Sequence, residues 1–155
     1  MSASKISVIG GGSFGTVIAN ITADTGHDVW FWMRSKSQAA DINKHHENSQ
    51  YLPGFKLNES VFATEDMVEA VSGSEVIFVA VPSSSFRQVV KEVVKHASAD
   101  AILVSTTKGI EPGTFLLMSQ VLKEEAPNAR IAVLSGPNLA KEIASKQLTG
   151  TVVAS

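Results

Sequence analysis

The sequence contains no cysteine, which excludes a disulfide framework, a thiolate nucleophile and a cysteine-ligated metal. It also lacks a strong charge of either sign, because the formal net charge of −2 gives no reason to expect a nucleic-acid or anionic-membrane partner. No apolar run approaches the roughly 20 residues that span a bilayer, and the N-terminus shows no signal-peptide pattern. From these absences we expect a cytoplasmic protein with no membrane or nucleic-acid partner and no metal site.

The stretch KISVIGGGSFGT, residues 5–16, has the pattern of a dinucleotide-binding turn. A short β-branched strand leads into Gly10, Gly12 and Gly15, which form G-x-G-x-x-G at the start of a helix. In this motif the first glycine permits the tight turn, the second lets the backbone approach a pyrophosphate, and the third lets the helix pack on the strand. The helix N-terminus adds unpaired N–H groups and a partial positive charge. An ordinary glycine-rich turn is the alternative interpretation.

The rest of the chain alternates short apolar segments with helical patterns, and 44% of its 155 residues are apolar, enough for the core of one ordinary domain. This alternation predicts an α/β fold: a Rossmann-like, doubly wound, mostly parallel sheet with helices on both faces. The predicted strands are residues 5–9, 28–33, 61–64, 75–79, 101–105, 130–134 and 149–154. The predicted helices are residues 13–25, 36–44, 66–71, 83–96, 113–125 and 138–144.

The end of the second predicted strand bears on cofactor choice. In a dinucleotide fold this strand tip meets the adenosine ribose, about 20 residues beyond the glycines. An acidic residue there would bind the 2′-hydroxyl of NAD, but this chain has Arg34, followed by Ser35 and Lys36. Cations and a hydroxyl suit a phosphate dianion, so we expect NADP to be preferred over NAD; a solvated arginine is the alternative. We assign Trp30 and Trp32 of the same strand to the core.

Three later strand ends bring further residues to the carboxyl edge of the sheet, where ligands bind in open α/β folds. Pro82 follows strand 75–79 and is either a wall beside the cofactor or the start of a helix. Lys108 follows strand 101–105 in a tight turn, where it could polarise a substrate carbonyl and stabilise an alkoxide as hydride arrives. Residues 135–138 form a strand-to-helix turn whose N–H groups suit an anionic or hydroxylated substrate.

Together, the segments GGGSFGT, STTKGIE and LSGPNLAKEI resemble the bacterial NAD(P)-dependent glycerol-3-phosphate dehydrogenase family. The resemblance implies reversible hydride transfer between NAD(P)H and dihydroxyacetone phosphate, which yields sn-glycerol 3-phosphate for phospholipid synthesis. Many family members have Ser or Thr where this chain has Asn138, although an amide can also donate and accept hydrogen bonds. The resemblance implies cofactor contacts for Ser13, Phe14, Arg34, Tyr51, Lys108 and Ala140, and substrate contacts for Lys108, Gly136 and Asn138.

The resemblance also implies a second, all-helical domain that carries the lysine acting as general acid/base. We therefore expect residues 1–155 to be the NAD(P)-binding domain, cut from a longer homodimeric protein, with the helical substrate domain absent from this chain and the acid/base beyond residue 155. Two other interpretations stay open: the nucleotide-binding domain of a dehydrogenase for a 3-hydroxy acid or a sugar acid, and a non-catalytic nucleotide-sensing module. A methyltransferase fits poorly, because Arg34 stands where an acidic ribose ligand is expected.

Overall fold

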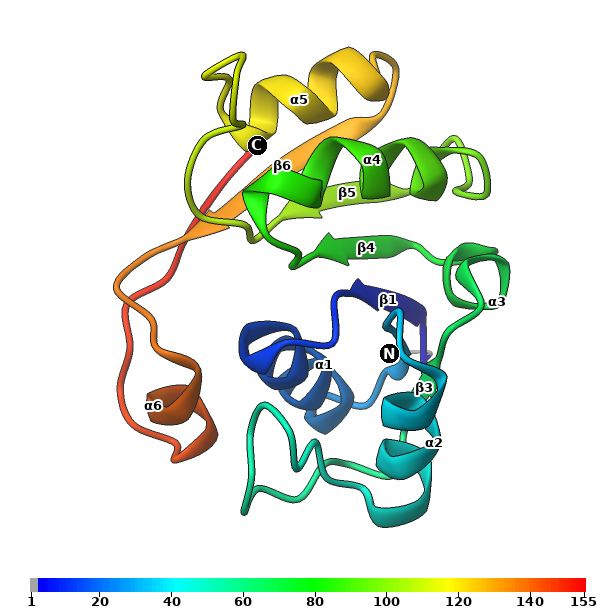
Figure 1. Cartoon of the computed structure of the whole chain (residues 1–155), viewed down its shortest axis with the longest axis vertical. Helices are drawn as coiled ribbons and strands as arrows, with labels where there is room; N and C mark the ends of the chain where they lie inside the picture. Colours follow the sequence, from blue (N-terminus) through cyan, green and yellow to red (C-terminus); the bar gives the residue numbers. More distant parts are fainter. Residues whose placement is uncertain (1–2) are drawn as a thin grey trace.

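A seven-stranded sheet in the order β3-β2-β1-β4-β5-β6-β7 forms the centre of the computed structural model, which describes residues 3–155 (Figure 1). Strands β1 to β6 run parallel, and β7 pairs antiparallel with β6. The order reverses direction at β1, as in two mononucleotide-binding halves joined side by side, so the predicted Rossmann-like fold is confirmed. The strands are β1 (Lys5–Ile9), β2 (Asp28–Trp32), β3 (Val61–Thr64), β4 (Val76–Val79), β5 (Ile102–Ser105), β6 (Arg130–Ser135) and β7 (Val152–Ala154).

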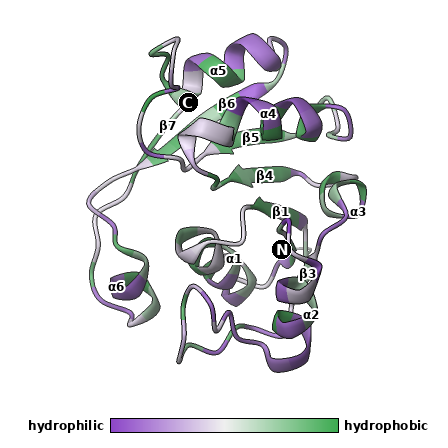
Figure 2. Ribbon diagram, viewed as in Figure 1, coloured by the Kyte–Doolittle hydropathy of each residue, from purple (hydrophilic) through white to green (hydrophobic). Residues whose placement is uncertain are grey.

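Helices cover both faces of this sheet. One apolar cluster joins α1 and α2 to one face, and a second joins α3, α4 and α5 to the other. Figure 2 shows hydrophobic residues along much of the strands and hydrophilic residues along much of α2 and α4, as expected for a parallel sheet buried on both sides. Within residues 3–155 no helix is both long and apolar enough to cross a bilayer. The helices are α1 (Ser13–Asp24), α2 (Lys36–His45), α3 (Met67–Val71), α4 (Ser83–Val94), α5 (Met118–Glu125) and α6 (Ala140–Ala144).

The predicted helix over residues 113–125 is wrong at its beginning, because α5 starts only at Met118. Gly113 and Phe115 have φ angles of +88° and +60°, and neither angle occurs within a right-handed helix. The segment before α5 instead forms a tight turn, closed by an antiparallel bridge between Ile110 and Leu117. The loop that follows β5 is therefore longer and more structured than its sequence indicates.

Two elements near the C-terminal end are also shorter than predicted. Helix α6 begins at Ala140 because the Asn138 side chain donates a hydrogen bond to Thr151 Oγ1 (2.8 Å), which holds the preceding turn away from the helix. Strand β7 begins at Val152 because β6 ends at its partner Ser135, so residues 149–151 have no strand to pair with. The other boundaries agree with the prediction to within a residue or two.

Candidate functional site

The three motif glycines in the turn between β1 and α1 differ in whether the fold itself requires glycine. Gly10 has a φ of +127°, and a Cβ there would lie 2.4 Å from the carbonyl oxygen of Ala80, so the turn requires glycine. A Cβ on Gly15 would lie 2.0 Å from the Gly10 carbonyl oxygen, so this glycine lets α1 pack against the turn. Gly12 has an ordinary φ of −80°, and a Cβ on it would meet no atom within 4 Å. Because the fold makes no demand at Gly12, its missing side chain leaves open space for a ligand.

The N-terminus of α1 faces this open space. Gly12 is its N-cap residue, no side chain caps it, and its first turn holds no acidic residue. The Ser13 hydroxyl instead donates to the Tyr51 carbonyl oxygen (2.7 Å), which ties the long loop after α2 to the glycine turn. The first N–H groups of the helix are thus available to an anion, and the helix dipole favours negative charge there.

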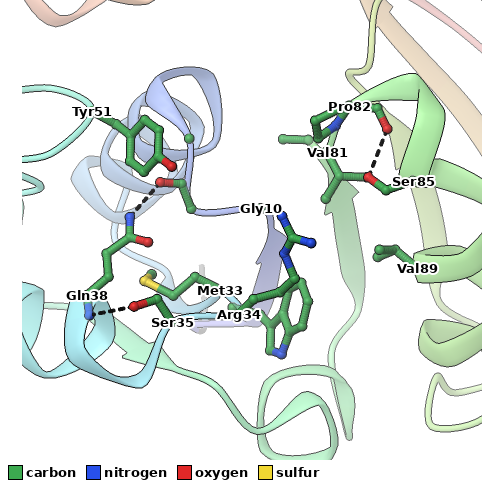
Figure 3. A pocket seen from close by; sticks show the side chains of 14 residues that line it. Gly10, Met33, Arg34, Ser35, Gln38, Tyr51, Val81, Pro82, Ser85 and Val89 are labelled. Carbon is green, nitrogen blue, oxygen red and sulfur yellow. Dashed lines mark hydrogen bonds between the residues drawn. The ribbon is translucent and has the colours of Figure 1, made fainter.

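A first cavity, of about 320 Å³, lies between the tip of β2 and the start of α4 (Figure 3). Arg34 is exposed, and among the residues that the structure describes it is the one charged residue that lines this cavity. Pro82 lies on the opposite wall and is also the N-cap residue of α4, so it is both a wall and a helix start. The predicted cofactor residues that line this cavity are Gly10, Gly12, Arg34, Tyr51 and Pro82.

A second cavity, of about 410 Å³, adjoins the first and shares Gly12 and Pro82 with it. Within residues 3–155 its one charged lining residue is Lys108, so the described lining of each cavity has a single cation and no carboxylate. That charge pattern favours an anionic ligand that extends across both cavities. The predicted residues that line this second cavity are Gly12, Ser13, Phe14, Pro82, Lys108, Asn138 and Ala140.

Lys108 joins the ends of β5 and β6. Its ammonium donates to the carbonyl oxygens of Gly136 (3.3 Å) and Asn138 (3.5 Å), which leaves the third of its three N–H donors for a ligand. Asn138 is only 3% exposed, and its Oδ1 has no hydrogen-bond partner among the described residues. Gly136 and Gly15 line neither cavity: Gly136 contributes its carbonyl to Lys108, and Gly15 allows helix packing.

The loop that carries Lys108 is anchored by an ion pair that the sequence did not indicate. Glu111 accepts two hydrogen bonds from Arg87 of α4, at 2.7 and 2.8 Å, and Arg87 also pairs with Glu124 (2.7 Å) and Glu125 of α5. The Arg87 hydrogen bonds lower the pKa of Glu111 to about 2, and the three carboxylates raise the pKa of Arg87. The Lys108 loop is therefore fastened to both α4 and α5.

Three residues at the site are not among the predicted cofactor or substrate residues: Trp32, Gln38 and Asn48. Trp32 packs against the core as predicted, yet it is half-buried and also lines the first cavity. Its indole N–H donates to the Glu65 carbonyl oxygen (2.9 Å). The signal that would have found it is its place at the carboxyl end of β2. Gln38 and Asn48 contact the glycine turn through hydrogen bonds to Gly11, and no local motif marks them.

These features define a dinucleotide-binding domain of the Rossmann type. They are the glycine turn at the point where strand order reverses, the open space before a helix N-terminus, and the two cavities that each contain a cation. Residues 5–155 match the family described as the NAD-dependent glycerol-3-phosphate dehydrogenase N-terminus, and the chain belongs to this family. The resemblance found in the sequence is thereby confirmed.

Curated relatives and solved structures agree with this family. The chain is 52% identical over 151 residues to a glycerol-3-phosphate dehydrogenase [NAD(P)+] of Teredinibacter turnerae, covering 97% of this chain and 44% of that protein. It is 52% identical over 152 residues to the enzyme of the same name from Pseudomonas fluorescens, with the same coverage. The crystal structure of a glycerol-3-phosphate dehydrogenase from Coxiella burnetii superposes with a TM-score of 0.91 at 28% identity, over 97% of this chain and 46% of that one. The chain thus spans less than half the length of these relatives.

Proposed function

We propose that this chain is the cofactor-binding domain of an oxidoreductase that interconverts sn-glycerol 3-phosphate and dihydroxyacetone phosphate by hydride transfer with NAD(P)H. The observation that carries the proposal is the pair of cavities that meet at Gly12, one with Arg34 and the other with Lys108. A dinucleotide has phosphate charge at its centre, which suits the helix N-terminus at Gly12, and NADP has a further phosphate at its adenosine end, which suits Arg34. Lys108 in the second cavity is then free for the substrate. Family membership favours this activity over the alternatives of a 3-hydroxy-acid or sugar-acid dehydrogenase.

The proposed cofactor lies across the carboxyl edge of the sheet. Arg34 pairs with the 2′-phosphate of the adenosine in the first cavity, which favours NADP while allowing NAD. The pyrophosphate lies in the open space at Gly12, against the first N–H groups of α1. The nicotinamide, which supplies or accepts the hydride, enters the second cavity beside Phe14, Pro82 and Ala140. Tyr51 closes the first cavity from the long loop.

The proposed substrate lies against Lys108 and the β6–α6 turn. The free N–H of Lys108 donates to the substrate oxygen and stabilises the negative charge that develops there as hydride arrives. Asn138 lines the same cavity and contacts the substrate beside Lys108, and Gly136 acts by holding Lys108 through its carbonyl. In this proposal a helical domain outside these 155 residues supplies the general acid/base. Homodimer formation and a cytoplasmic location stay predictions for the longer protein.

The decisive experiment is a steady-state assay of NADPH oxidation with dihydroxyacetone phosphate, using the full-length parent protein. We expect turnover with this substrate, and we expect Lys108→Ala to lower kcat and raise KM. The matched control is Lys44→Ala, which removes an exposed lysine on α2 and should leave both constants unchanged. A parent that oxidises NADPH only with a 3-hydroxy acid or a sugar substrate would refute the proposed activity. A parent that binds NADPH but reduces none of these substrates would support a sensing module.

A further inference from the structure

The middle of the glycine turn is held by two amide side chains that the family resemblance does not name. We propose that Asn48 and Gln38 are positioning residues that lock the peptide between Gly11 and Gly12, so that the Gly12 N–H faces the cofactor pyrophosphate. This inference rests on the proposed cofactor site and assigns the residues that keep it in its binding conformation.

The hydrogen bonds around Gly11 form a closed network. Asn48 is fully buried, and its amide nitrogen donates to the Gly11 carbonyl oxygen (3.0 Å) and to Thr16 Oγ1 (2.7 Å). From α2, the Gln38 amide nitrogen donates to the same Gly11 oxygen (2.7 Å) and to Asn48 Oδ1 (3.2 Å); Figure 3 shows Gln38 pointing toward the turn. Thr16 Oγ1 in turn donates to the Gly12 carbonyl oxygen (2.8 Å). Both N–H bonds of each amide are used, so the network has one consistent orientation.

The geometry of the peptide bond transmits this constraint to the cofactor side. In a trans peptide the carbonyl and the following N–H point in opposite directions. Fixing the Gly11 oxygen toward Asn48 and Gln38 therefore aims the Gly12 N–H away from them, and this N–H donates to no backbone group in residues 3–155. Gly12 lines both cavities, so this donor is available where they meet. A hydrogen bond from such a donor to a phosphate oxygen is among the stronger ones in proteins.

The two amide side chains are needed because Gly12 makes the opposite orientation of the Gly11–Gly12 peptide accessible. Turning the Gly11–Gly12 peptide over changes the φ of Gly12 by about 180°, from −80° into the left-handed region. A residue with a side chain would resist that φ, but glycine does not. The same missing Cβ that leaves room for a phosphate thus removes the steric cost of the flipped peptide. In that flipped peptide the Gly11 carbonyl oxygen would face and repel the pyrophosphate. Asn48 and Gln38 supply the restraint that Gly12 itself cannot.

The test uses two nucleotide probes that separate this role from a merely structural one. ADP carries the pyrophosphate but no 2′-phosphate, whereas adenosine 2′-monophosphate carries the 2′-phosphate but no pyrophosphate. Calorimetric titration would give the affinity of each probe for the wild-type chain and for Asn48→Asp, which keeps the size of the side chain but places carboxylate oxygens against the Gly11 carbonyl. Asn48→Ala adds no charge, so a loss of ADP affinity in this variant too cannot arise from the carboxylate of Asn48→Asp.

We expect both Asn48 variants to weaken ADP binding by at least about tenfold, the loss of one charge-assisted hydrogen bond, and to leave the affinity for adenosine 2′-monophosphate unchanged. The matched control is Asn43→Asp, which removes an amide that donates to the Ala63 carbonyl oxygen (2.8 Å) on the same side of the sheet, away from the turn. Asn43→Asp should change neither affinity. Thermal unfolding of each variant would be recorded alongside.

Three results would overturn the proposal: unchanged ADP affinity in a folded Asn48 variant, equal loss of both nucleotides, or ADP-selective loss in Asn43→Asp. If the Asn48 variants do not fold, Gln38→Leu replaces them, because Gln38 is half-buried on a helix surface and its loss still removes one of the two donors to Gly11. Unchanged ADP affinity in Gln38→Leu would then refute the proposed positioning of the Gly11–Gly12 peptide. A wild-type chain that binds neither probe would refute the proposed cofactor site, and with it the positioning role of Asn48 and Gln38.

Discussion

Two single residues, one at the glycine turn and one at the tip of β2, are central to the proposed binding of the dinucleotide. Gly12 acts through an absent side chain, since a Cβ there would project into open space rather than into the protein. The proposed role of Arg34 depends on its charge, because it is exposed and no acidic residue among residues 3–155 lines the same cavity. For each residue we therefore predict that a substitution changes cofactor binding while the chain still folds.

We predict that Gly12→Val abolishes cofactor binding while the fold survives. The valine side chain would occupy the space that the pyrophosphate needs, yet no atom of residues 3–155 lies within 4 Å of its Cβ. Circular dichroism and NADPH titration would check both parts. The contrasting variant is Gly15→Val, whose Cβ would lie 2.0 Å from the Gly10 carbonyl oxygen and which should lower the unfolding temperature as well. Normal NADPH binding by Gly12→Val would show that the phosphates are placed wrongly.

We predict that the chain binds NADPH more tightly than NADH and that Arg34→Ala removes the difference. A charge-assisted contact with the 2′-phosphate is worth roughly 1.5–3 kcal/mol, which is about tenfold or more in affinity. Fluorescence titration of wild type and variant with both cofactors measures it. Lys36→Ala is a suitable comparison, because Lys36 pairs with Glu65 (3.4 Å) rather than lining the cavity. Equal loss of NADPH and NADH affinity in Arg34→Ala would contradict this role.

At the scale of elements, the loop between β5 and α5 shows how the segment that carries Lys108 is held in place. Lys108 is at its start, the Ile110–Leu117 bridge closes it, and Glu111 fastens it to Arg87 of α4. Glu111 is 9% exposed, so it forms part of the interior rather than a solvated surface. The position of Lys108 thus depends on an ion pair with a helix that precedes it in the chain.

The Glu111–Arg87 pair leads to a prediction for stability at acid pH. The ordinary pKa of a glutamate is 4.5, and in the folded protein the pKa of Glu111 is lowered to about 2. A depressed folded-state pKa means that the stabilising contribution is present above pH 4.5 and is lost as the pH falls toward 2. We expect Glu111→Gln to reduce the free energy of unfolding at neutral pH and to flatten its decrease across this acid range.

Chemical denaturation at a series of pH values, for wild type and Glu111→Gln, would measure this effect. Glu59→Gln serves as the control, because it removes a glutamate that is exposed and should leave the pH profile unchanged. Identical acid profiles for wild type and Glu111→Gln would mean that the ion pair does not form in solution.

At the scale of the whole molecule, the part of the chain that the structure describes contains the proposed cofactor site and part of the proposed substrate site. The second cavity is lined by Lys108 and Asn138 but by no His, Asp or Glu of the described part of the chain that could act as a proton donor. The relatives extend over more than twice the length that this chain matches, since it covers 44% of each of the two curated enzymes compared above. Hydride transfer to a carbonyl also requires a proton, so the complete reaction is expected to need groups outside these residues.

We predict that this chain alone does not reduce dihydroxyacetone phosphate at an enzymatic rate. A positioned acid contributes typically 10²–10⁴ in rate, and without a closing wall, water would weaken the polar contacts with the substrate. Steady-state rates of NADPH oxidation would be compared between the 155-residue chain and the full-length parent at saturating cofactor. A rate for the chain within about tenfold of the parent would mean that the acid lies among these residues.

The sequence by itself determined the order of the elements, the Rossmann-like fold and the dinucleotide turn, because hydrophobic periodicity and the spacing of Gly10, Gly12 and Gly15 are local properties of the chain. It failed at residues 113–117, where Phe115 adopts a positive φ that its residue type does not indicate. The tertiary structure alone decided the pairing of Arg87 with Glu111 across 24 residues, and the contact of Asn48 with Gly11 across 37. Such pairs carry no local signal, because their distances are set only when strands and helices from distant parts of the chain pack together.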